Sequence, residues 1–241
     1  MGSKRVRFPE RTLRDLRRVS REVNRACKVL DDAEPLKGAI YLKDAQGQEA
    51  NIEVYYTEEC PHAGLVQYNY SGEMLKDAYI VTNPDYCIQQ TEKGVYYALY
   101  HELQHILDLN VLRYRKNYDS YHNEVAEQYF GHEYEFRAYT NEILEGIVNE
   151  YKRLVKEHSK EEVLDAADSL LRFFGQDGIG GELNRKVLFR ITSERPNKKK
   201  TPYTLQVLAL IKEHNPQRWK YFLKMLYSTV EEIKEEVVGS N

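Results

Sequence analysis

Cysteine is scarce in this sequence of 241 residues, and long apolar runs are missing. Its three cysteines, Cys27, Cys60 and Cys87, are widely spaced and odd in number, so they fit neither a disulfide framework nor a paired-cysteine zinc site. No segment approaches the roughly 18 consecutive apolar residues that span a bilayer. The opening MGSKRVRF lacks the apolar core of a secretion signal. We therefore expect a cytoplasmic protein in a reducing compartment, with no membrane span.

A large net charge is also missing, because 35 Lys and Arg residues nearly balance 38 Asp and Glu residues. The charges are nevertheless uneven, since residues 1–28 hold ten Lys and Arg against three Asp and Glu. Such asymmetry is typical of an RNA, membrane or acidic-partner contact. No aromatic residue beyond Phe8 interleaves with the arginines, which gives a nucleic-acid partner only weak support. We interpret the segment as a helix with a solvated basic face that docks on an acidic body. The composition does not determine an oligomeric state.

Hydrophobic periodicity predicts a helix, then a small sheet, then more helices. Apolar residues at helical spacing predict the first helix over residues 10–32. Short strand-like runs follow at 39–42, 52–56 and 78–82. Further helices are expected at about 91–110, 123–158 (with a bend at Gly131) and 160–174, followed by two more from about residue 202. This order predicts an α+β fold, with a small antiparallel or mixed sheet packed on the 91–110 helix and a mostly helical C-terminal region.

The chemistry is concentrated in the run His101-Glu102-Leu103-Gln104-His105. Residues four apart on a helix differ by about 40° of rotation and ~6 Å of rise, so both imidazoles point the same way. Two neutral imidazoles in that arrangement can bind one Zn²⁺ ion at about 2.0–2.1 Å. Glu102 is turned aside by about 100°, where it can take a proton from water beside the ion. The pattern predicts a hydrolytic zinc site.

The residues around this run predict that its helix is buried. They are uncharged, whereas a chance match on an exposed helix would carry charges: Leu99, Leu103, Gln104, Ile106 and Leu107. The strand-like run Ala78–Thr82 precedes the helix, and we expect it to be an edge strand that pairs with an extended substrate.

The segment YALYHELQHILD resembles the active-site helix of the zincin metallopeptidases. The resemblance implies that His101 and His105 bind zinc, that Glu102 is the general base and that a downstream residue completes the site. The metzincin branch would continue with two residues, Gly, two residues and His. Residues 108–112 read DLNVL instead, which excludes that branch.

The gluzincin branch takes its third ligand from a Glu on a second helix, in a pattern of Glu, two residues and Ala. Glu135 and Ala138 match this pattern, so the resemblance implies Glu135 as the third ligand, with Glu133 as its rival. Tyr139 departs from the Asp that often follows the Ala. Asp108 lies one helical turn after His105 and could orient a ligand imidazole in its place.

These patterns predict a zinc metallopeptidase that acts on a peptide or protein substrate, with residues 36–158 as its core. Residues 1–35 would form a basic amphipathic helix, and residues 159–241 a helical subdomain. The alternatives are a catalytically inactive binding protein on a zincin scaffold and a nucleic-acid binder built on the first helix. The oxyanion-stabilising residue stays open among candidates close to the motifs in sequence: Tyr121, His122, His132, Arg137 and Tyr139.

Overall fold

The computed structural model describes most of the chain, in two compact units. The described residues are 6–29, 34–43, 47, 49–57, 60, 64–71, 74–83, 92–112, 133–175 and 203–239. One unit is Arg7–Val125, here called the sheet unit. The other, the helical unit, is Met1–Val6 together with Ala126–Asn241. These bounds differ from the three segments expected above, and the three-segment division stays a prediction.

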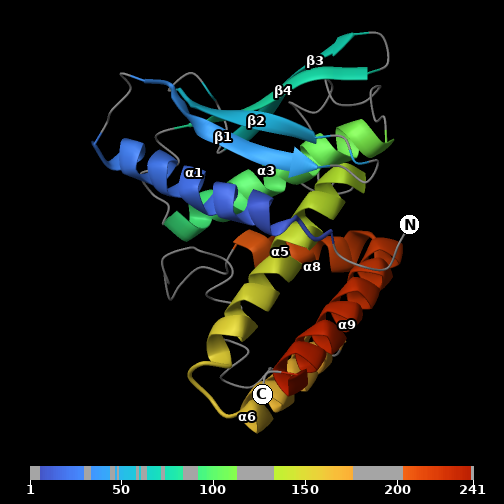
Figure 1. Ribbon diagram of the computed structural model, residues 1–241. Coiled ribbons are helices and arrows are strands. Elements are labelled where there is room, and N and C mark those ends of the chain that lie inside the picture. The colour runs from blue at the N-terminus through green and yellow to red at the C-terminus, as the bar shows by residue number, and fades with distance from the viewer. Residues whose placement is uncertain are drawn as a thin grey trace. The chain divides into compact units, whose positions relative to one another are not determined.

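The sheet unit holds a four-stranded sheet and two described helices (Figure 1). In chain order its elements are α1 (Glu10–Val29), β1 (Leu36–Lys43), β2 (Glu49–Tyr56), β3 (Gly64–Ser71), β4 (Met74–Thr82) and α3 (Glu92–Leu112). With the helical unit described below, this composition confirms the α+β class.

The strands lie in the order β1-β2-β4-β3. The outer pairs, β1 with β2 and β3 with β4, are antiparallel, whereas the central pair, β2 with β4, is parallel. The sheet is therefore mixed. The prediction that Ala78–Thr82 is an edge strand is wrong, because this run belongs to β4 and has a neighbour on each side. The edge next to β4 is β3, which the sequence analysis does not predict.

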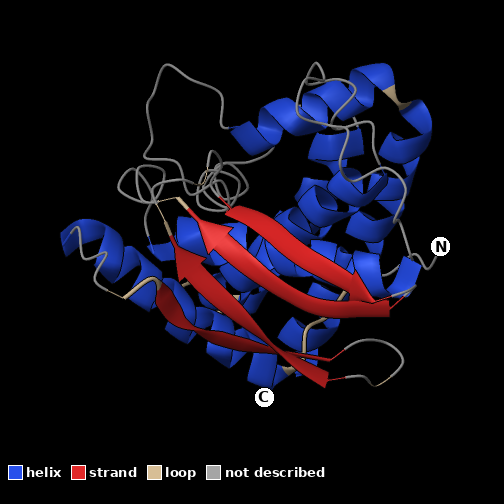
Figure 2. Ribbon diagram, turned by 90° about the horizontal axis from the view of Figure 1, so that it is seen from above, coloured by secondary structure: helices blue, strands red, loops and turns tan. Residues whose placement is uncertain are grey.

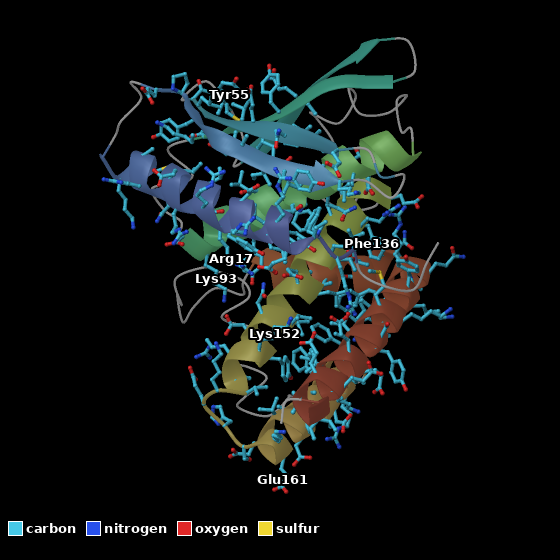
Figure 3. The ribbon with its side chains drawn as sticks, viewed as in Figure 1. Arg17, Tyr55, Lys93, Phe136, Lys152 and Glu161 are labelled. Atoms are coloured by element: carbon cyan, nitrogen blue, oxygen red, sulfur yellow. The ribbon has the colours of Figure 1, made fainter. Side chains whose placement is uncertain are left out.

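Buried and more exposed side chains alternate along β2, so one face of the sheet is apolar and covered. Ile52, Val54 and Tyr56 are buried, whereas Tyr55 between them is only half-buried. Helices α1 and α3 lie on the same face of the sheet (Figure 1), with α1 against β1 and α3 against β3 and β4. Tyr55 lies on the opposite face (Figure 3), which Figure 2 shows turned to the viewer.

Helix α1 confirms the first predicted helix up to Val29, the last residue described there. Its apolar stripe packs inward, since Leu16, Val19 and Val23 are fully buried. Two arginines of the basic face contact β1. The Arg11 guanidinium lies 4.0 Å from the ring centroid of Tyr41, and Arg18 donates a hydrogen bond of 2.9 Å to the carbonyl of Ala39. Part of the basic face therefore holds the helix on the sheet.

The helical unit packs around α9. Its described elements are α5 (Glu133–Leu154), α6 (Lys160–Gly175), α8 (Tyr203–His214) and α9 (Pro216–Gly239). Helix α9 contacts each of the other three. Their apolar faces meet in one core, which includes Leu144, Leu170 and Phe222. No helix in the described part of the chain is both long enough and apolar enough to cross a membrane.

Several predicted features fall outside the described residues. The helix expected at 123–158 is described only from Glu133, so the proposed bend at Gly131 is not part of what the structure describes. The helices predicted at 91–110 and 160–174, and the two predicted from about residue 202, are confirmed.

Candidate metal centre

Helix α3 carries the histidine pair and is buried around it. Leu99, Leu103 and Gln104 have no exposed surface, and Ile106 and Leu107 are also buried. The aromatic side chains of the helix add to this packing, since Phe8 meets Tyr100 edge to face with ring centroids 4.8 Å apart. The prediction of a buried helix around the motif is confirmed.

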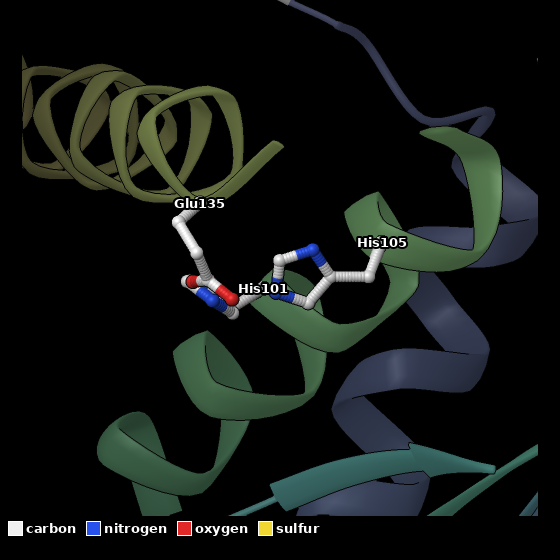
Figure 4. A group of neighbouring side chains, drawn as sticks. All are labelled: His101, His105 and Glu135. Atoms are coloured by element: carbon white, nitrogen blue, oxygen red, sulfur yellow. The ribbon is translucent and has the colours of Figure 1, made fainter. Parts of the chain in front are cut away.

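His101 and His105 project from one face of α3 (Figure 4). Their ring centroids are 4.6 Å apart, with the planes at 83° to each other. Their relative exposures are only 7% and 3%. Helical geometry places the two rings one turn apart, and the surrounding apolar side chains limit their movement. The two imidazoles therefore lie close together and buried on one face of the helix.

Glu135, in the first turn of α5, completes a group of three possible ligands. One ligand atom from each of His101, His105 and Glu135 lies within 4.8 Å of the others, and the Glu135 side chain points toward the imidazoles (Figure 4). A tetrahedral zinc ion with bonds of about 2.0–2.1 Å would hold such atoms about 3.4 Å apart. Two imidazoles and a carboxylate are a donor set that zinc accepts, so these residues fit a zinc ion.

Glu102 lies beside the start of β3, on a different side of α3 from the histidines. A Cβ atom built on Gly64 would lie 2.9 Å from Cγ and 3.1 Å from Oε1 of Glu102. Glu102 is half-buried, which leaves part of its surface accessible. A carboxylate so placed is next to the edge strand of the sheet and one residue from a histidine of the group.

Asp108 and Gln104 form a buried polar pair on α3. The Gln104 side-chain amide donates a hydrogen bond of 2.9 Å to Oδ1 of Asp108, and both side chains are at most 2% exposed. Because Gln104 binds one carboxylate oxygen, Asp108 has a fixed orientation one turn from His105. Its predicted part in orienting an imidazole stays a prediction.

The other carboxylate and oxyanion candidates have different surroundings. Glu133 is half-buried. The pKa of Tyr221 in α9 is raised above its ordinary value, first by burial; the charge of Arg137 lowers it, and that of Glu133 raises it. Tyr139 packs against the core of the helical unit. Tyr121, His122 and His132 lie outside the described residues. Among the candidates that the structure describes, Arg137 and Tyr139 therefore gain no support as oxyanion-stabilising groups.

Sequence reasoning missed Gly64 as a neighbour of Glu102. The run Leu65 to Tyr70 alternates Val66, Tyr68 and Tyr70 with polar residues, which is a strand signal that could have placed Gly64 at the start of β3. A scan against protein-family models and searches of curated proteins and solved structures found no match for this chain.

Proposed function

We propose that this protein is a zinc-dependent peptidase in which His101, His105 and Glu135 hold the metal and Glu102 is the general base. The observation that carries the proposal is the group of three ligand atoms within 4.8 Å of one another. A buried His, His and Glu group on two helices matches the composition of a catalytic zinc site, which keeps a fourth position for water or substrate.

The bound ion would supply Lewis acidity, which lowers the pKa of water and polarises a substrate carbonyl. The protein's own part falls to Glu102. Its carboxylate would take a proton from the attacking water and pass it to the leaving amine. Its half-buried position beside β3 keeps it within reach of solvent and of a chain lying along that strand.

Strand β3 supports a peptide substrate in particular. In the described sheet β3 pairs with β4 and forms one edge. An edge strand presents unpaired backbone N–H and C=O groups, to which an extended peptide adds as a further strand. The substrate-pairing role predicted for Ala78–Thr82 therefore moves to β3 in this proposal. A peptide held there would pass Gly64, next to Glu102.

The test compares Glu102→Gln with the wild type on a peptide mixture analysed by mass spectrometry. We expect hydrolysis to fall by roughly 10²–10⁴-fold, because an amide cannot take the proton, while the zinc content stays at one ion per chain. Glu92→Gln is the matched control, since Glu92 is an exposed glutamate in the first turn of the same helix, and it should retain full activity.

Two results would overturn the proposal. A purified wild type without stoichiometric zinc would remove the metal site. Undiminished hydrolysis by Glu102→Gln would remove the proposed base. Bound zinc with no hydrolysis by the wild type would instead favour a binding protein on the same scaffold.

A further inference from the structure

The first residue of β3 is a glycine that meets the side chain of Glu102. A Cβ atom at Gly64 would lie 2.9 Å from Cγ, 3.1 Å from Oε1 and 3.3 Å from Cδ of that glutamate. These three atoms run from the middle of the side chain to its carboxylate. Glu102 therefore packs against β3 at Gly64, in the space where any other residue at position 64 would carry its Cβ.

The backbone conformation gives no reason for a glycine at position 64. Gly38 and Gly47 have positive φ angles of 140° and 84°, a region that favours glycine, but Gly64 is not among the positive-φ glycines. Gly64 is also in regular antiparallel register opposite Thr82 of β4. A glycine inside a strand weakens it, and often marks a place where another group approaches the backbone closely. At position 64 that group is Glu102.

We infer that Gly64 is a positioning residue for Glu102: the absence of a side chain at the start of β3 lets the glutamate pack against the strand. This inference rests on the proposed function for its catalytic meaning, but the contact itself involves only residues of the sheet unit. A methyl group at position 64 would displace the Glu102 side chain, since three rotatable bonds make the glutamate easier to move than the strand. None of the three atoms nearest to that methyl group belongs to a proposed metal ligand.

The displacement should affect the chemical step more than substrate binding. A general base must lie within hydrogen-bond distance of the proton that it takes, and a misplacement of about 1 Å can cost roughly 10²-fold in rate. The backbone groups of β3 that would pair with a peptide are unchanged by an added methyl group. Gly64→Ala should therefore lower kcat and leave KM nearly unchanged.

The first experiment measures kcat, KM, zinc content and Tm for Gly64→Ala in the full chain. We expect kcat to fall by about 10²-fold, KM to stay within about twofold of the wild type and the chain to keep one zinc ion. Gly239→Ala is the control, because a Cβ at Gly239 meets nothing within 4 Å, and its kcat should equal that of the wild type. A Gly64→Ala variant with wild-type kcat would overturn the inference.

A second experiment tests the contact without any activity. The Tm effect of Gly64→Ala is measured in the wild type and again in Glu102→Ala, which lacks the crowding atoms. We expect Gly64→Ala to lower the Tm of the wild type. In Glu102→Ala the same substitution should leave Tm unchanged or raise it, because the strand then accepts an alanine at position 64.

Failure of the inference and failure of the proposed function can thus be told apart. If the wild type hydrolyses no peptide, the proposed function fails and the Tm comparison still measures the contact. Equal Tm shifts in both backgrounds would overturn the inference, as would loss of folding by Gly64→Ala in both. If Gly64→Ala alone does not fold but the double variant with Glu102→Ala does, the inference is supported.

Discussion

The two carboxylates at the start of α5 differ in what surrounds them. Glu135 is 5% exposed and grouped with the imidazoles of His101 and His105. Glu133 is half-buried and acts on the hydroxyl of Tyr221. Side chains two positions apart on a helix point in directions that differ by about 200°. Glu133 and Glu135 therefore cannot both face the same group. The grouping of Glu135 with the two imidazoles is the reason why we propose it, and not Glu133, as the third ligand.

Zinc affinity separates the two glutamates experimentally. Glu135→Gln should weaken zinc binding at least about tenfold, since loss of an outer-shell partner alone costs roughly 10–100-fold. Glu133→Gln, the matched control two residues away, should leave the affinity unchanged. Competition with a chromophoric chelator measures both dissociation constants. A larger loss for Glu133→Gln would reverse the assignment.

At the scale of residues, the sequence predicts those features that a single helix determines. The spacing of His101 and His105 predicts their shared face, because 3.6 residues per turn leave no alternative on a regular helix. The choice between Glu135 and Glu133 cannot be made in this way, since it depends on the rotation of a second helix. The contact of Gly64 with Glu102 depends on a strand about 40 residues earlier in the chain, so only the fold reveals it.

At the scale of elements, helix α6 begins with a capping box that the structure shows in full. Ser159 Oγ accepts a hydrogen bond of 3.3 Å from the Glu162 N–H, and Oε2 of Glu162 accepts one of 3.0 Å from the Ser159 N–H. Each side chain thus satisfies a backbone donor that the first turn of a helix leaves unpaired. These bonds fix where α6 begins after the turn that follows α5.

The Ser159 bonds lower the pKa of Glu162, the backbone bond most and the side-chain bond next. A carboxyl group whose pKa is lower in the folded state stabilises the fold above its unfolded pKa of about 4.3. That contribution is lost as the pH falls through the folded value. Glu162→Gln should therefore lower Tm at pH 7, and its difference from the wild type should shrink below about pH 4.

Thermal unfolding from about pH 3 to pH 7 measures this dependence, because that range includes the ordinary pKa of a glutamate side chain, about 4.3. Glu161→Gln is the control, because Glu161 is exposed in the same turn of α6 but is not part of the capping box. Its Tm difference from the wild type should not shrink on acidification as that of Glu162→Gln does. A Tm difference between Glu162→Gln and the wild type that grows on acidification would contradict the stabilising role of the Glu162 carboxylate in the capping box.

The strand order shows what element patterns leave open. Alternation with a period of two predicts which face of β2 is buried, and Ile52, Val54 and Tyr56 follow that pattern. Alternation carries no information on which strands pair, so the parallel pairing of β2 with β4 and the edge position of β3 emerge only from the fold. For this reason the prediction of an edge strand at Ala78–Thr82 is wrong, although these residues do form a strand.

At the scale of the molecule, each unit has its own apolar interior. In the sheet unit the buried faces of α1, α3 and the sheet meet, with Leu16, Ile40 and Leu103 among the residues that have no exposed surface. In the helical unit the core surrounds α9. The order of helix, small sheet and helices along the sequence was sufficient to predict the α+β class.

Metal binding offers a test on the whole chain that needs no substrate. An ion that binds the folded but not the unfolded chain stabilises it by about 2.7 kcal/mol when its free concentration is 100 times Kd. For a chain of this size that corresponds to a Tm increase of roughly 5–10 °C. Removing the metal with a chelator should lower Tm by this amount, and added zinc should restore it.

The response of Tm to zinc should depend on the ligands and not on the base. His105→Ala should unfold at the same temperature with and without zinc, because one imidazole and one carboxylate bind the ion too weakly to stabilise the fold at the same zinc concentration. Glu102→Gln should keep the full increase, since its carboxylate is proposed to act on water and not to bind the ion. A zinc-dependent increase that survives His105→Ala would place the metal elsewhere in the chain, and with it the hydrolytic chemistry proposed for α3.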